Sequence, residues 1–212
     1  MMSARLSSSV FEYALSRQLR SARQLAETQP NVFSSGIDVL DEAFADTVRA
    51  GQIIEWGIPR GRNGRRIPLL FLREQALPAV WVYGDPELHI YAPAWASFGI
   101  DLQKLFYIRS EQPVQQLRPL FVDDSFKIIV LDAPRKLSRG DIAFISQQAR
   151  YNRQLVFIIR HYFLSAGRGT AQAAMRVNCW QNAQGDYQLH FIKGKQISAL
   201  SLQPEVVLHD EH

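Results

Sequence analysis

The sequence has one cysteine, Cys179, in 212 residues. A single thiol excludes an internal disulfide and any metal site built from paired cysteines. The chain also lacks a run of about 18 apolar residues, which argues against a membrane-spanning helix. Its first residues include Arg5 and Glu12 but no continuous apolar stretch, so we expect neither a signal peptide nor a transit peptide. These absences predict a protein of the reducing cytoplasm with no membrane association.

The excess of positive charge is small. Lys and Arg total 24 against 20 Asp and Glu, which gives a formal net charge of +4 and does not by itself indicate a nucleic-acid-binding protein. The chain is 47% hydrophobic and has no internal repeat or low-complexity segment, so it can bury one sizeable core. No arrangement of Ser, His and Asp has the context of a nucleophile elbow.

Short apolar runs alternate with amphipathic stretches along most of the chain. The apolar runs predict strands buried on both faces, at 51–56, 79–83, 105–108, 126–131 and 155–159. The stretches between them predict helices, at 67–75, 92–98, 114–121 and 138–151, the last with Ser138 as its N-cap. This alternation is typical of an α/β fold with a mainly parallel central sheet flanked by helices. Alternating patterns at 173–180 and 186–192 add a C-terminal antiparallel hairpin.

We expect three parts in the chain: an N-terminal helical appendage (1–30), a core domain (31–203) and a flexible tail (204–212). The appendage has apolar residues at helical spacing before Pro30, namely Val10, Phe11, Ala14, Leu15 and Leu19. Such a stripe either packs on the core or docks on another protein. Our hypothesis is a partner-binding helix.

A glycine- and arginine-rich turn follows the first predicted strand, in the segment 51–66, GQIIEWGIPRGRNGRR. A P-loop requires G-x-x-x-x-G-K-[ST], in which backbone N–H groups hold the phosphates, Lys neutralises them and the hydroxyl binds Mg²⁺. Here Pro59 takes the place of the first glycine, and Arg65 and Arg66 replace the Lys and the hydroxyl residue. We therefore interpret the turn as a degenerate nucleotide- or anion-binding loop; its candidate residues are Gly57, Arg60, Gly61, Arg62, Gly64, Arg65 and Arg66. The alternative is a basic surface turn that never bound nucleotide.

Two acidic positions lie at the carboxyl ends of predicted strands, where parallel sheets usually bind their ligands. Asp132 ends the run FKIIVLD, which has the form of a Walker B strand that holds Mg²⁺. Glu87 lies with Asp85 in the turn after the strand 79–83, where a carboxylate could orient a water molecule. The alternative in both places is an acidic residue that only begins a turn.

The order of these segments resembles the core of the RecA recombinase family over about residues 33–195. FSSGIDVLD at 33–41 resembles the S/T-G-x-x-x-L-D motif of that family, FGIDLQKL at 98–105 its turn into the third strand, and FKIIVLD at 126–132 its Walker B strand. Within the group, the degenerate loop, the segment YAPA at 91–94 and the C-terminal hairpin are most similar to the ImuA family.

This resemblance implies a non-catalytic RecA-like adaptor or regulator in the SOS DNA-damage response, which supports error-prone translesion synthesis. It implies a pseudo-ATPase with no cofactor and no metal, in which Asp132 and Glu87 are relics of the metal-binding and water-polarising positions. The implied partners are a Y-family polymerase-like protein, RecA or both, with DNA and self-association in addition. Two alternatives stay open: a SulA-like division inhibitor that acts on a tubulin-like GTPase, and an ATPase with an atypical P-loop.

Overall fold

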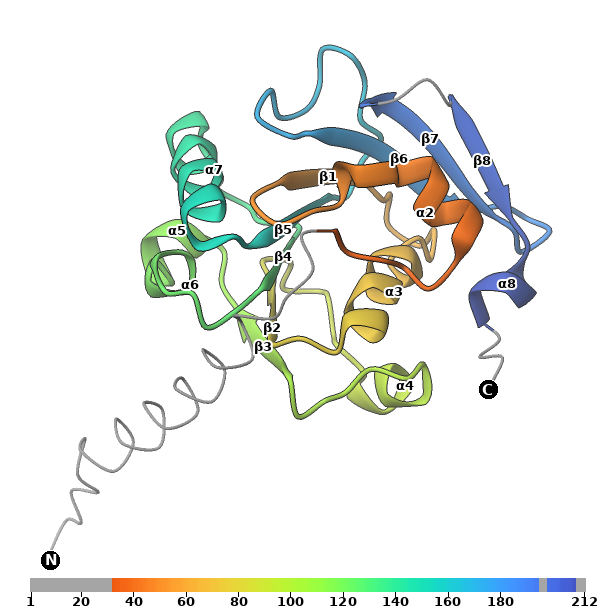
Figure 1. Ribbon diagram of the computed structural model, residues 1–212, viewed down its shortest axis with the longest axis horizontal. Helices are drawn as coiled ribbons and strands as arrows, with labels where there is room; N and C mark the ends of the chain where they lie inside the picture. The colour runs from red at the N-terminus through yellow and green to blue at the C-terminus, as the bar shows by residue number, and fades with distance from the viewer. Residues whose placement is uncertain (1–31, 195–197, 209–212) are drawn as a thin grey trace, which may run out of the picture. The chain divides into compact units, whose positions relative to one another are not determined.

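The computed structural model describes residues 32–194 and 198–208 (Figure 1). The predicted partner-binding helix therefore lies outside the described residues. The fold is α/β, with one eight-stranded sheet in the order β3-β2-β4-β5-β1-β6-β7-β8. The strands are β1 (Ile53–Gly57), β2 (Ala79–Tyr83), β3 (Leu105–Arg109), β4 (Ile128–Asp132), β5 (Leu155–Arg160), β6 (Met175–Gln181), β7 (Tyr187–Lys193) and β8 (Ala199–Leu202).

The sheet is mostly parallel, as the sequence predicts. Strands β1 to β6 pair in parallel, whereas β7 pairs in antiparallel fashion with β6 and β8 pairs in antiparallel fashion with β7. The predicted C-terminal hairpin is thus confirmed as β6 and β7, and β8 extends it by a third strand. This architecture is consistent with a RecA-like core.

Helices join most of the parallel strands. They are α2 (Asp38–Phe44), the 3₁₀ turn η1 (Ala45–Thr47), α3 (Arg66–Gln75), α4 (Ala92–Ser97), α5 (Pro113–Gln116), α6 (Pro119–Val122), α7 (Arg139–Asn152) and α8 (Pro204–Leu208). Ser138 caps α7 as predicted: its hydroxyl accepts from the Asp141 N–H, and the Asp141 carboxylate accepts from the Ser138 N–H.

Two expectations for the helices are wrong. The helix predicted at 114–121 is two short helices, because Pro119 has no N–H to continue the first and instead begins the second. The flexible tail does not begin at residue 204, because residues 204–208 form α8 and Val207 is fully buried in the main core. No helix within the described ranges is long and apolar enough to cross a membrane.

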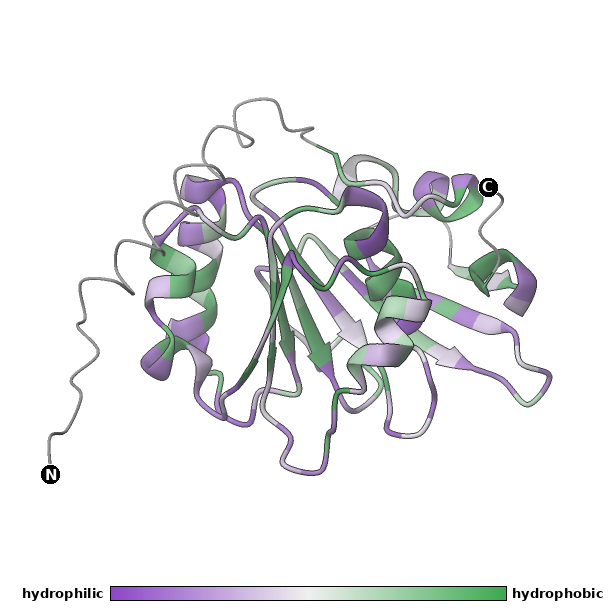
Figure 2. Ribbon diagram, turned by 90° about the horizontal axis from the view of Figure 1, so that it is seen from below, coloured by the Kyte–Doolittle hydropathy of each residue, from purple (hydrophilic) through white to green (hydrophobic). Residues whose placement is uncertain are grey.

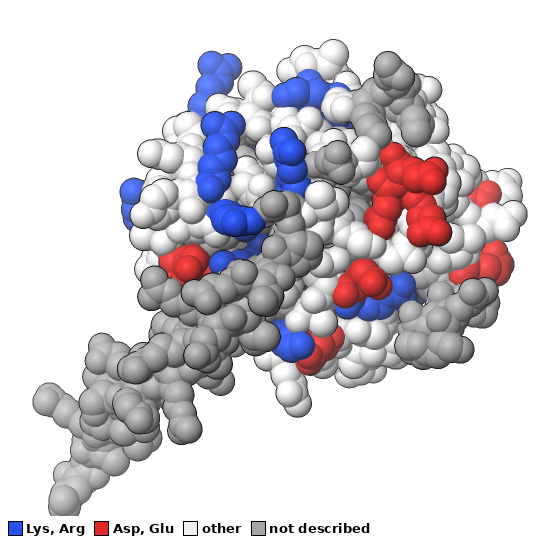
Figure 3. All heavy atoms as spheres, viewed as in Figure 1, with Lys and Arg blue, Asp and Glu red and all other residues white. Residues whose placement is uncertain are grey.

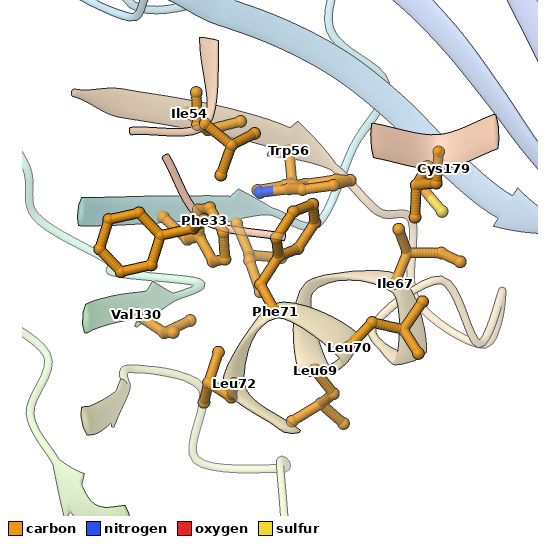
Figure 4. Packing of buried hydrophobic residues seen from close by; sticks show 14 of the residues in the cluster. Phe33, Ile54, Trp56, Ile67, Leu69, Leu70, Phe71, Leu72, Val130 and Cys179 are labelled. Atoms are coloured by element: carbon orange, nitrogen blue, oxygen red, sulfur yellow. The ribbon is translucent and has the colours of Figure 1, made fainter. Parts of the chain in front are cut away.

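Helices cover both faces of the sheet (Figure 2), and the central strands are hydrophobic. All five residues of β1 are buried, as expected for a parallel strand covered on both faces. On one face α3 packs against β1, with Phe71 close to Trp56 (Figure 4). The ring of Phe157 in β5 lies 5.7 Å from both of these rings, so three aromatic side chains hold α3 on the sheet. This packing places the turn between β1 and α3 at the carboxyl edge of the sheet.

Candidate functional site

An ion pair between Arg65 and Asp132 lies at the carboxyl edge of the parallel strands. Arg65 directly precedes α3, and Asp132 is the last residue of β4. The Arg65 guanidinium donates from Nε to Asp132 Oδ2 at 2.8 Å and from Nη2 to Oδ1 at 3.0 Å. The Asp132 side chain is fully buried, so this is a bidentate, charge-assisted pair in the protein interior.

Further side chains complete the surroundings of the Asp132 carboxylate. Trp81 of β2 donates from Nε1 to Oδ2 at 3.2 Å, and His161, directly after β5, places Nε2 3.3 Å from Oδ1. The same His161 nitrogen contacts Arg65 Nη2. Each carboxylate oxygen therefore has two partners, and an ionised carboxylate offers only about four acceptor positions in all.

The charge state of Asp132 follows from these contacts. Burial by itself would raise the pKa of Asp132, but the hydrogen bonds from His161 and Arg65 and the positive charge of Arg65 outweigh it. The pKa is therefore lowered from its ordinary value. Asp132 is ionised at neutral pH, and its charge is balanced by Arg65.

A second, more exposed layer of charges surrounds this pair. Arg60 donates to Asp85 Oδ2 and to Glu87 Oε2, both at 2.6 Å. The Asp85 carboxylate also lies 3.2 Å from Nδ1 of His161. His161 therefore lies between Asp85 and Asp132 and links the outer layer to the inner pair. A cavity of about 200 Å³, lined in part by Arg60, Asp85 and His161, adjoins the network.

The predicted loop glycines pack against β6. A Cβ atom on Gly57 would lie 2.1 Å from Oδ1 of Asn178, and one on Gly64 would lie 2.5 Å from the carbonyl oxygen of Cys179. No side chain fits at either position without displacing β6. Gly61, by contrast, has a φ of +71° and open space around it, as in an exposed turn. Glycine at 57 and 64 thus serves close packing rather than an open phosphate cradle.

The four arginines of the turn do not form one patch of unpaired cations. Arg60 and Arg65 are paired with carboxylates as described, and Arg66 interacts with Tyr187 and lies 5.9 Å from the Phe98 ring centroid. Only Arg62 is exposed with no side-chain partner within the described part of the chain. Internal partners therefore reduce the mutual repulsion of these arginines. Anion binding by the turn stays a prediction, with Arg62 as the arginine available for it.

The sequence analysis missed His161, Trp81 and a second buried ion pair. Glu55, in the middle of β1, is fully buried and accepts from Nε of Arg160 at 2.9 Å and from the Thr170 hydroxyl at 2.8 Å. The Thr170 N–H also donates to Glu55. Because Thr170 lies in the segment between β5 and β6, this pair fixes that segment on the sheet. A lone acid within an apolar strand is the signal that could have identified Glu55. For His161 the signal is its position directly after a strand, since Asp132 was identified by its position at the end of one.

The contacts of the site occupy the two side chains at the loop and strand-tip positions. Asp132 has no open acceptor position for a metal, and Arg65 is committed to it. In the ranges that the structure describes, no three His, Cys, Asp or Glu side chains group as a metal site. Burial raises the pKa of the Cys179 thiol, which leaves it unreactive. No protein-family model matches the sequence, and a comparison with curated proteins gives no match either.

Proposed function

We propose that this chain is a non-catalytic protein with a RecA-like core that acts as an adaptor or regulator. The observation that carries the proposal is the buried pair of Arg65 and Asp132. In a P-loop enzyme, the cation of the loop faces the phosphates and the Walker B carboxylate faces the metal. Here the residues at those places in the sequence face each other, and each neutralises the charge that the other would offer to Mg²⁺ and nucleotide.

Nucleotide binding in the ordinary way would have to break this pair. Removing one partner of a buried ion pair costs about 3–5 kcal/mol, because the other charge is left buried and unpaired. Arg66 offers no hydroxyl to the metal in return. A bound nucleotide would therefore lose much of its interaction energy in opening the site, and the transition state for hydrolysis would lack charge stabilisation.

The proposed cellular role is support of error-prone translesion DNA synthesis in the SOS response. This part of the proposal rests on the resemblance to the RecA family in the segments 33–41, 98–105 and 126–132, and to the ImuA family in the degenerate loop, the segment 91–94 and the C-terminal hairpin. The fold is compatible with that role but is shared by proteins of many functions. The proposed partners in the cytoplasm are a Y-family polymerase-like protein, RecA or both, with self-association as a further possibility.

Turnover and binding measurements test the non-catalytic part. We expect the purified full chain to hydrolyse ATP no faster than the protein-free background, with or without DNA and Mg²⁺. Asp132→Asn, which keeps the shape of the side chain, should give the same result. ATP hydrolysis that this variant abolishes would contradict the proposal and favour an ATPase with an atypical loop.

Binding to purified candidates tests the adaptor part. The full chain, immobilised through a terminal tag, is offered a Y-family polymerase-like protein, RecA and a tubulin-like GTPase of the same cell. We expect saturable binding to the polymerase-like protein or to RecA. Binding to the GTPase alone, with inhibition of its polymerisation, would contradict the proposed role and support a SulA-like inhibitor.

A further inference from the structure

A shallow groove lies on the outer surface of α7. It has a volume of about 530 Å³ and is lined by Ala143, Ser146, Gln147, Arg150 and Tyr151 of the helix and by Gln172 of the segment before β6. The end of α7 packs closely on Gly51: a Cβ atom there, at a φ of +85°, would lie 3.4 Å from the Arg150 Cα. Since Gly51 precedes β1, the groove is near the edge where the parallel strands begin, opposite to the edge of Arg65 and Asp132.

The segment that carries Gln172 is held in place on both sides of that residue. Thr170 is bound through its N–H and its hydroxyl to the buried Glu55. Lys193 of β7 donates from Nζ to the carbonyl oxygens of residues 171 and 173, at 2.8 and 2.6 Å. Both walls of the groove are therefore fixed before any ligand binds, which lowers the entropic cost of binding.

Three side chains of the groove have no partner among the described residues. The Arg150 guanidinium makes no hydrogen bond or ion pair there, and the Tyr151 side chain is 83% exposed and makes no ring contact. Ser146 is only 7% exposed, yet its hydroxyl makes no hydrogen bond to any described group. Polar groups that are taken out of water normally have a hydrogen-bond partner. An acceptor that enters the groove would supply one to Ser146.

The charge around the groove is positive. Arg139 lies exposed on the same helix, and like Arg150 it makes no ion pair with any described residue. The one acid in α7 is Asp141, and its carboxylate accepts hydrogen bonds from Ser138. Figure 3 shows Lys and Arg side chains over the region of α7, whereas Asp and Glu side chains gather over α2. A negatively charged partner is therefore favoured at the groove.

We propose that the groove between α7 and Gln172 binds an extended acidic segment of a protein partner, with a carboxylate of that segment held by Arg150. A guanidinium and a carboxylate form two parallel charge-assisted hydrogen bonds, and the Ser146 hydroxyl can donate a third. The amide groups of Gln147 and Gln172 both donate and accept. They match a peptide backbone, which has one N–H and one C=O in nearly every residue. The exposed Tyr151 ring gives the segment a flat surface on which to pack.

Other kinds of partner fit the groove less well. Ala143 is the largest aliphatic side chain among the described residues that line it, so an amphipathic helix would find little apolar surface to bury. A nucleic acid strand carries a negative charge on every phosphate, whereas Arg150 is the one cation among those lining residues. An acidic segment extends the adaptor role proposed above, on which the inference rests.

An array of short synthetic peptides, from strongly acidic to strongly basic, tests this site with the labelled full chain. We expect binding to acidic peptides and none to their counterparts with Asn and Gln in place of Asp and Glu. Fluorescence anisotropy of the tightest acidic peptide then gives a Kd. Arg150→Gln should raise this Kd about 10- to 150-fold, the range for loss of a hydrogen bond to a charged group.

Two further variants separate direct contact from a structural role. Ser146→Ala should raise the Kd about 2- to 10-fold without loss of stability, because its hydroxyl has no partner among the described residues of the free protein. Arg150→Glu should abolish binding of the acidic peptide. A Lys scan of that peptide should find a position at which the exchanged charge restores binding to this variant.

Matched controls come from exposed residues elsewhere in the fold. Tyr91→Ala removes a ring that is 69% exposed next to α4, and Arg109→Gln removes an exposed cation at the end of β3. Both should leave the Kd for the acidic peptide unchanged. Circular dichroism of each variant confirms that it is folded.

Three results would overturn the proposal. The first is no binding of any acidic peptide by the wild type at low salt, and the second is equal loss of affinity in Arg150→Gln and Arg109→Gln. The third is an oligothymidylate that needs Arg150 and Ser146 for binding while the acidic peptide does not, which would assign the groove to nucleic acid. Failure of the adaptor role gives a different result: the groove then binds acidic peptides, but the chain binds neither the polymerase-like protein nor RecA.

Discussion

The two basic regions of this molecule differ in how their charge is used. The turn 57–66 has the densest arginines in the sequence, yet Arg60 and Arg65 are neutralised by carboxylates at the same edge of the sheet. The arginines of α7 are sparse in the sequence, but Arg139 and Arg150 find no partner among the described residues. A cluster of one charge along the chain therefore does not locate a charged surface. What matters is whether the fold places opposite charges next to it.

Removing the inner arginine should have the largest effect. We expect Arg65→Met to lower the free energy of unfolding by about 3–5 kcal/mol, because it leaves the buried Asp132 charge without its cation. The double variant Arg65→Met/Asp132→Asn should recover part of the loss, since it removes both charges. Urea denaturation of the wild type, the single variant and the double variant measures these free energies of unfolding. A loss below about 1 kcal/mol in the single variant would mean that the turn is not held by this pair.

This pair also shows where prediction from sequence ends. The strand 126–131 and the acid at its tip could be predicted, because an apolar run that ends in Asp depends only on local pattern. The partner of Asp132 could not. It depends on the strand order, which places β5 alone between β4 and β1 and so brings the turn after β1 within reach. Local patterns could not show that order.

The C-terminus shows the same limit on a smaller scale. Residues 204–208 are too few to display a helical period, so the sequence suggested a loose tail. The helix α8 is stabilised by the burial of Val207 in the core beside α3, a contact between distant parts of the chain. In the same way, Glu55 was hidden in an apolar strand until its partners Arg160 and Thr170 were placed.

The second buried pair should contribute less than the first. We expect Glu55→Gln to lower the free energy of unfolding by about 1–3 kcal/mol, because it weakens the bonds to Arg160 and Thr170 but keeps the shape. Hydrogen exchange at the Thr170 amide should become faster. Glu111→Gln is the matched control, since the Glu111 side chain makes only an exposed pair with Arg135, at 3.4 Å, among the described residues. This variant should change the free energy of unfolding by less than about 1 kcal/mol. Equal effects of the two variants would contradict a structural role for Glu55.

Acid should weaken the inner pair. The pKa of Asp132 is lower in the folded protein than in the unfolded chain, where it is about 3.9. Its contribution to stability is therefore present above the unfolded value and is lost as the pH falls through the folded value. We expect the unfolding free energy of the wild type to fall more steeply in acid than that of Asp132→Asn, so that the two curves converge. Parallel curves below about pH 4 would show that the Asp132 carboxylate is not responsible for the loss of stability in acid.

The smallest effect is expected at Arg62, which is the direct test of the comparison between the two basic regions. Its exposed side chain has no partner among the described residues, so Arg62→Ala should change the free energy of unfolding by less than about 0.5 kcal/mol. Arg62 is also the arginine of the turn that is available to an anion, so the same variant tests anion binding by the turn. Loss of Arg62 should reduce the slope of log K against log salt for an oligothymidylate by about 0.7, as expected for one lost phosphate contact. An unchanged slope would show that the turn is not an anion-binding surface.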